Sequence, residues 1–203
     1  MNPRFFDLPD ARQQDILRAG YRVFANNSYK HSPMSEIAAE AGVSKSLLFH
    51  YFRNKRELYL YLWQHCAKIT VEAMTRHGCY GQKDLFDSME RGMEAKLEVL
   101  ARWPDMGNFT VRAFYETDAE IAPAIRESYR YFFSKKADKT LTALDPGQFV
   151  PGLDLNMMYR EMYWASEGYL WEAVQKGNLD LEVLQRDFKK LLEFWKSIYL
   201  RKE

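Results

Sequence analysis

The stretch that decides the fold is EIAAEAGVSKSLLFHYF, residues 36–52. Its first half is rich in alanine and stops at Gly42, which can adopt the positive φ that turns a chain after a helix. Ser44 then suits the N-cap of a second helix, because its hydroxyl can accept a hydrogen bond from a free backbone N–H. Two short helices joined in this way are the pattern of a helix-turn-helix.

The second of these helices separates apolar residues from residues that can contact a partner. Its apolar side is formed by Leu48, Tyr51 and Phe52. Its opposite side carries Lys45, Ser46 and Phe49. A buried side opposite a side headed by a cation and hydroxyls meets the needs of a helix that enters the major groove of DNA. The alternative is a plain helical hairpin, and the turn pattern alone favours that alternative slightly.

Apolar residues recur at helical spacing along nearly all of the 203 residues, without strand alternation or a hairpin signal. We therefore predict an all-α protein of about nine helices. Glycines and prolines mark the breaks between them. The predicted helices cover approximately residues 10–26, 33–41, 44–52, 54–77, 82–103, 105–117, 121–143, 155–176 and 180–200. We expect Ser32, Ser44 and Asn54 to be N-caps, with Pro33 at the first helical position.

The composition bounds the class of protein. Hydrophobic residues make up 47% and charged residues 28% of the chain, which is ordinary for a soluble protein. The first 58 residues hold nine Lys and Arg against six Asp and Glu, a mild basic bias that suits contact with a polyanion. Two cysteines are too few for a disulfide scaffold. No signal peptide or membrane-spanning run is recognised, so we expect a cytoplasmic protein.

Residues 16–58 resemble the DNA-binding domain of the TetR family of bacterial transcriptional regulators. The matching positions keep the family's spacing without insertions or deletions: Ile16, Leu17, Ala19, Phe24, Ser28–Tyr29, Ser32–Pro33, Ile37–Ala38, Ala41–Gly42–Val43–Ser44, Leu48–Phe49–His50–Tyr51–Phe52 and Lys55–Arg56–Glu57–Leu58. The resemblance covers about a quarter of the chain. It implies a helix-turn-helix domain of three helices over residues 1–54 and a helical domain for effector binding and dimerisation over residues 55–203.

The resemblance also implies which side chains meet DNA. Lys45 and Ser46 would contact base edges, and Leu47 a thymine methyl group. Phosphates would be contacted by Ser32, Ser44, His50, Tyr51 and Lys55. Phe49 stands on the same surface where the family usually has Tyr, so it cannot supply that hydroxyl to a phosphate. Two further departures from the family pattern are Ser28 in place of Gly and Ser46–Leu47 in place of Gly-Thr. The alternatives are a core position for Tyr51 and a solvated one for Lys55.

The two C-terminal helices carry sustained apolar stripes. The resemblance implies that they pair with the same helices of a second copy in a four-helix bundle, which makes the protein a homodimer. The candidate interface residues are Met162, Tyr169, Leu184, Phe188, Leu191 and Trp195. The alternative is that both stripes pack within the monomer.

The region between residues 85 and 171 is rich in Phe, Tyr, Trp and Met. Most of these side chains must form the core, but the resemblance implies a site for a small, mostly apolar effector among them. The candidate residues are Met89, Met93, Phe109, Arg112, Tyr129, Phe132 and Tyr163. The sequence names neither the effector, the operator nor the regulated genes.

The sequence gives little support for metal binding or catalysis. The pairs His65–Cys66 and His77–Cys79 lack the spacing of a metal site, and Glu116, Asp118 and Glu120 suit capping better than acid–base catalysis. No nucleotide, hydrolase or metalloprotease motif is present. We expect no catalytic residue, metal or cofactor.

The predicted function is a ligand-responsive DNA-binding regulator, more often a repressor than an activator, that binds an inverted repeat as a dimer. The alternatives are an all-helical enzyme and a helical protein-binding adaptor.

Overall fold

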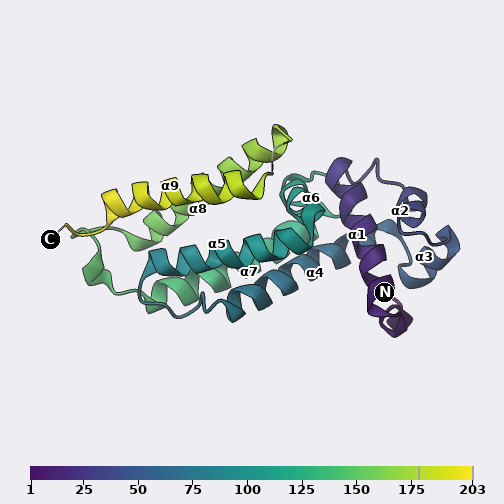
Figure 1. Ribbon diagram of the computed structural model, residues 1–203, viewed down its shortest axis with the longest axis horizontal. Helices are drawn as coiled ribbons and strands as arrows, with labels where there is room; N and C mark the ends of the chain where they lie inside the picture. Colours follow the sequence, from purple (N-terminus) through teal and green to yellow (C-terminus); the bar gives the residue numbers. More distant parts are fainter. Residues whose placement is uncertain (178, 203) are drawn as a thin grey trace. The chain divides into compact units, whose positions relative to one another are not determined.

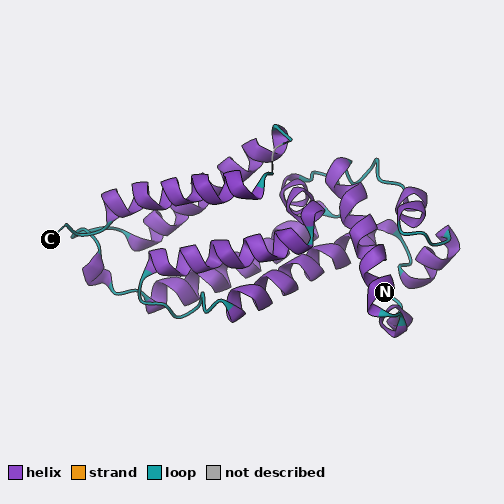
Figure 2. Cartoon of the chain, in the orientation of Figure 1, coloured by secondary structure: helices purple, strands orange, loops and turns teal. Residues whose placement is uncertain are grey.

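The computed structural model describes residues 1–177 and 179–202 (Figure 1). Within them the structure is helical, which confirms the predicted all-α class (Figure 2). The nine α-helices of the described residues are α1 (Asp10–Asn26), α2 (Met34–Glu40), α3 (Lys45–Tyr51), α4 (Lys55–Arg76), α5 (Leu85–Arg102), α6 (Pro104–Tyr115), α7 (Ala122–Ala143), α8 (Leu155–Gln175) and α9 (Leu181–Tyr199). Two short 3-10 helices accompany them, η1 (Pro3–Asp7) and η2 (Pro146–Gln148). Among the described helices, none combines the length and the apolar character needed to cross a membrane.

Packing groups the chain into two compact units. The N-terminal unit contains residues 1–69 together with 103–129. The C-terminal unit contains residues 70–102 and the chain from residue 130 onward. Helices α4 and α7 therefore each begin in the first unit and end in the second. The division after residue 54 that the resemblance implies is a functional one and stays a prediction.

The turn between α2 and α3 shows why this sequence makes a helix-turn-helix. Gly42 has a φ of +62°, a conformation that residues with a side chain rarely adopt. The Val43 N–H donates to the Ala38 carbonyl at 2.9 Å and the Gly42 N–H to the Ala39 carbonyl at 3.1 Å, which closes a Schellman motif. Ser44 then caps α3, since its Oγ accepts from the Leu47 N–H at 3.1 Å, as predicted.

The core of the N-terminal unit lies behind this turn. Its most deeply buried side chains include Phe5, Ile16, Phe24, Ile37, Leu48, Phe52, Leu58, Leu62 and Phe109. Helices α1 and α4 approach closely at Gly20, where an added Cβ would lie only 2.8 Å from Leu62 Cδ1. A glycine at this position therefore lets α4 pack directly on the backbone of α1.

Two local features of this unit differ from the sequence predictions. Pro33, not Ser32, occupies the N-cap of α2, and the Ser32 Oγ instead donates to the Ser28 carbonyl at 2.9 Å. That hydrogen bond closes the turn before α2, so the hydroxyl is not available to cap the helix. The helix η1 was not predicted, because five residues are too few to show a periodic pattern.

The C-terminal unit has its own core. It is built from Leu85, Phe86, Leu144, Phe149, Met158, Met162, Leu192 and Trp195. Asp154 and Asp180 cap α8 and α9, each accepting two backbone N–H groups. The end of α9 is tied to the segment after η2, because the Val150 N–H donates to the Tyr199 carbonyl at 3.0 Å.

The turn at Gly42 gives a testable prediction. We expect Gly42→Ala to lower the free energy of unfolding by about 1 kcal/mol, because alanine is strained at this φ. The added methyl would meet Arg12 Nη1 at 3.8 Å, an ordinary contact, so a steric clash adds nothing. Chemical denaturation measures the difference between the variant and the wild-type protein.

The matched control is Gly92→Ala in α5, where the new Cβ would lie 3.7 Å from Met74 Cε without a positive φ. Alanine is the better helix former, so this variant should be at least as stable as the wild type. Equal destabilisation by both substitutions would show that backbone strain at Gly42 is not the cause.

Candidate nucleic-acid interface

The outward side of α3 is the candidate contact surface. The exposed residues of this helix are Lys45, Ser46, Leu47, Phe49 and His50, whereas Leu48 and Tyr51 are buried together with the adjoining Phe52. The predicted separation of the two sides is therefore confirmed. Leu47 and Phe49 are 38% and 37% exposed, an unusual apolar content for the free side of so short a helix. The Lys45 ammonium lies 5.9 Å from the centre of the Phe49 ring.

Ser44 and Ser46 begin this surface with two hydroxyls. The Ser44 Oγ lies 3.0 Å from the Ser46 Oγ while it accepts the Leu47 N–H, so one hydroxyl orients the other. Both residues are exposed. The Ser46 hydroxyl is therefore held at the start of the helix, where the first side chains of a recognition helix meet base edges.

Three predicted phosphate contacts have internal roles in the structure. Ser32 is fully buried, so its predicted phosphate contact has no surface from which to form. Tyr51 is 7% exposed, and its ring packs against Phe5 at a centroid distance of 5.8 Å. The Lys55 ammonium donates to the Tyr29 carbonyl at 2.7 Å and lies 4.4 Å from the centre of the Tyr29 ring. These side chains stabilise the structure that underlies the exposed side of α3.

An acidic segment after α6 holds the loop that precedes α2. The Tyr29 N–H donates to Glu116 Oε2 at 2.9 Å, and the Tyr29 hydroxyl donates to Glu120 Oε2 at 2.8 Å. Arg56 Nε donates to the Glu120 carbonyl at 2.9 Å. Burial and the Glu120 carboxylate raise the pKa of Tyr29 well above its ordinary value. The two glutamates thus hold the loop in place rather than form an acid–base pair, and no sequence pattern indicated their contacts with Tyr29.

The candidate effector residues are divided between the two units. Phe109 is a core residue of the N-terminal unit, with the rings of Tyr21, Phe24 and Tyr59 around it. Arg112 in the same unit is exposed, and the Tyr129 ring packs on Phe114. The candidates of the C-terminal unit are Met89, Met93, Phe132 and Tyr163. Phe132 is 41% exposed, and Phe109 is fully buried among other rings.

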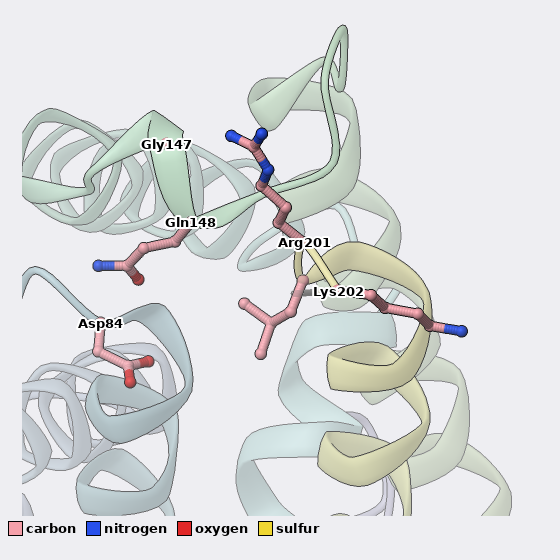
Figure 3. A pocket seen from close by; sticks show the side chains of 6 residues that line it. Asp84, Gly147, Gln148, Arg201 and Lys202 are labelled. Atoms are coloured by element: carbon pink, nitrogen blue, oxygen red, sulfur yellow. The ribbon is translucent and has the colours of Figure 1, made fainter.

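The C-terminal unit also contains an open hollow of about 390 Å³ (Figure 3). It is lined by Asp84, Gly147, Gln148, Leu200, Arg201 and Lys202. None of the candidate effector residues is among them. Its lining carries charges of both signs from Asp84, Arg201 and Lys202, and Leu200 is the one large apolar side chain among the six lining residues, so it offers no long apolar pocket for an effector.

The dimer candidates are divided between core and surface. Met162 and Trp195 belong to the core of the C-terminal unit, Leu184 is buried, and Phe188 and Leu191 pack against that core. The Tyr169 hydroxyl donates to Asp187 Oδ2 at 3.1 Å. The predicted interface residues Met162, Leu184 and Trp195 are thus wrong, because the most regular apolar stripe packs inside the monomer. The exposed apolar residues of α8 and α9 are Met157, Trp164, Phe194 and Ile198.

The His and Cys side chains considered as metal ligands in the sequence contact other side chains instead. The Tyr21 hydroxyl lies 2.8 Å from His65 Nδ1, and Cys66 Sγ lies 3.2 Å from Thr110 Oγ1. His77 Nε2 lies 2.7 Å from Glu98 Oε2. Within residues 1–177 and 179–202, no group of three or more His, Cys, Asp and Glu side chains could hold a metal ion.

Comparison with known proteins agrees with this geometry. Residues 16–62 match the model of the family described as bacterial regulatory proteins, tetR family. The transcriptional activator FasR of Mycolicibacterium smegmatis is 44% identical over 125 residues, which cover 61% of this chain and 55% of FasR. The transcriptional repressor Rv1474c of Mycobacterium tuberculosis is 25% identical over 123 residues, 59% of this chain and 65% of the repressor. The matched segment therefore spans less than two thirds of either relative.

The fold is similar to that of solved regulators over most of the chain. The structure of the transcriptional regulator FadR of Bacillus subtilis in complex with stearoyl-CoA matches with a TM-score of 0.65 and 19% identity. The match covers 88% of this chain and 96% of FadR. FasR and Rv1474c are transcriptional regulators, and the FadR match shows a shared fold.

Proposed function

We propose that this chain is a member of the TetR family of bacterial regulatory proteins, whose model its residues 16–62 match. It reads an inverted-repeat DNA operator as a homodimer and changes its DNA affinity when an apolar effector binds. The observation that carries the proposal is the exposed side of α3, backed by a fully buried Leu48. A helix that reads bases in the major groove needs one side fixed in the core. Its exposed side must offer cationic, hydroxyl and apolar groups to the base edges.

Each exposed side chain of α3 has a distinct partner on DNA. Lys45 donates to the O6 and N7 atoms of guanine, and the Ser46 hydroxyl pairs with a neighbouring base edge. Leu47 and Phe49 cover thymine methyl groups or the sugar edge, where a hydroxyl is not needed. Ser44 and His50 contact phosphates at the two ends of the helix. Phosphate contacts position the helix and base contacts select the sequence.

The exposed apolar residues of α8 and α9 form the dimer face. Met157 and Trp164 are one heptad apart on α8, and Phe194 and Ile198 are four residues apart on α9. They are 52%, 58%, 57% and 43% exposed, which is a large apolar surface to leave in water. A two-fold axis through this face joins identical patches and brings two α3 helices to two half-sites.

The effector is a long-chain acyl group, and the C-terminal unit binds it. The support is the FadR structure, which contains stearoyl-CoA. In this chain the rings of Phe133, Tyr159 and Tyr163 lie together, with Phe133 to Tyr163 at 4.5 Å and Phe133 to Tyr159 at 6.3 Å. Binding changes DNA affinity through α4, which runs from one unit into the other. An effector acts only if the two arrangements of α4 bind it unequally.

The direction of regulation follows from the operator rather than from the fold. FasR is an activator and Rv1474c a repressor, although both resemble this chain. A dimer that covers a promoter blocks transcription, whereas one bound beside it can assist the polymerase. We expect repression if the operator overlaps the promoter.

The DNA contact is tested with an operator selected from random duplex DNA at two salt concentrations. We expect an inverted repeat whose affinity falls steeply with salt. Lys45→Ala should weaken operator binding about 10-fold or more, with a smaller loss on random DNA, because a base contact is removed. Fluorescence anisotropy measures both affinities. Lys83→Ala, which removes an exposed cation from the other unit, is the matched control. Equal losses on both DNAs would make Lys45 a phosphate contact, and no enriched repeat would contradict the function.

The dimer face is tested by placing charge on it. We expect Trp164→Glu combined with Phe194→Glu to give a folded monomer, because four carboxylates would meet at the two-fold axis. Sedimentation velocity measures the mass, and circular dichroism checks the helices. Tyr131→Glu is the matched control, since this α7 side chain is 59% exposed outside the proposed face. A double variant that stays dimeric would place the interface elsewhere.

The effector is tested by adding stearoyl-CoA to the complex of protein and operator. We expect the DNA affinity to change several-fold at micromolar ligand, since coupling free energies of about 1–3 kcal/mol are usual. Coenzyme A without the acyl chain is the control and should leave the affinity unchanged. An equal response to both ligands, or no response to either, would contradict an acyl effector.

A further inference from the structure

The N-terminal segment lies against the last turn of α3. The Asn2 backbone N–H donates to the Tyr51 carbonyl at 2.8 Å, and its side-chain Nδ2 donates to the His50 carbonyl at 3.1 Å. The last carbonyls of a helix have no partner inside the helix. Asn2 therefore supplies two donors to the end of α3 from a segment almost fifty residues away in the sequence.

Phe5 fixes this segment in place. Its side chain is fully buried, and its ring centroid lies 5.8 Å from that of Tyr51 and 5.1 Å from that of Phe52. The Tyr61 ring of α4 lies 5.8 Å away. Because aromatic packing on three sides holds η1, Asn2 is positioned by the core.

Asn2 also contacts the His50 ring. Its Nδ2 lies 3.2 Å from His50 Nε2, while its Oδ1 accepts the Arg4 N–H at 3.1 Å. The Arg4 hydrogen bond identifies the amide oxygen, so the NH₂ group must face the ring. A donor at this position requires a lone pair on Nε2. The proton of the neutral imidazole is then on Nδ1.

We infer that Asn2 is a positioning residue of the DNA-binding surface, which holds His50 as the Nδ1–H tautomer so that this N–H donates to a phosphate oxygen of double-stranded DNA. The inference rests on the proposed function, because the phosphate belongs to the operator. His50 is exposed at the end of α3, opposite the end that carries Ser44 and Lys45. The two ends of the helix are then fixed to the backbone of the duplex by the Ser44 hydroxyl and the His50 N–H, and Lys45 and Ser46 keep their register on the bases.

A purely structural role for Asn2 would give a different pattern. Asn2→Ala keeps the backbone N–H that caps Tyr51 and removes only the amide. If the amide merely stabilised α3, its loss would weaken DNA binding whether or not His50 were present. If it acts through His50, its loss has no effect once the imidazole has been removed.

The experiment is a double-mutant cycle with the selected operator. We expect Asn2→Ala and His50→Ala each to lower operator affinity about 3- to 10-fold, the range of one hydrogen bond. The double variant should bind as His50→Ala does. Asn26→Ala, which removes an exposed amide that bonds the Arg22 carbonyl, is the control and should bind as the wild type does. Losses that multiply in the double variant would overturn the inference.

A second measurement reads the tautomer directly in the protein without DNA. Nitrogen-15 NMR of the imidazole should show the Nδ1–H form of His50 in the wild type. Asn2→Ala should shift His50 toward the Nε2–H form that free imidazole side chains prefer. An Nε2–H tautomer in the wild type would overturn the inference while the proposed function stands. Failure of the wild type to bind any duplex would overturn both.

Discussion

The hydrogen bond from the Val43 N–H to the Ala38 carbonyl closes the turn after α2, and the direction of α3 follows from it. The bond forms because Gly42 adopts a φ of +62° at no steric cost. Once α3 is set in this direction, Leu48 and Phe52 reach the core, and Lys45 and Phe49 remain outside. The proposed base contacts, the support by Phe5 and the cap at Asn2 all depend on that division.

The sequence predicted those features of the helix-turn-helix that depend on interactions between residues close together in the chain. The turn residue Gly42, the cap Ser44 and the two sides of α3 follow from neighbours within one or two helical turns. The helix boundaries were predicted within a few residues for the same reason, because glycine, proline and capping side chains act where they stand. These local signals were sufficient to predict the all-α fold class.

Partners that are distant in sequence explain what could not be predicted. Lys55 resembles a phosphate contact until the structure shows the Tyr29 carbonyl 2.7 Å from its ammonium. Glu116 and Glu120 look like solvent-facing acids until the same loop is found against them. Periodicity also selects the wrong stripe for the dimer, since Trp195 and Phe194 are adjacent in sequence and only burial distinguishes core from surface.

The N-terminal unit is built from two separate segments of the chain, which limits where the chain can be divided. That unit includes residues 103–129, so the loop at Tyr29 and the ring of Phe24 complete their packing only with Glu116 and Phe109 from a later part of the chain. A single recombination point after the first four helices would separate these partners. Exchanging the chain before that point alone is therefore expected to lower the stability of the N-terminal unit.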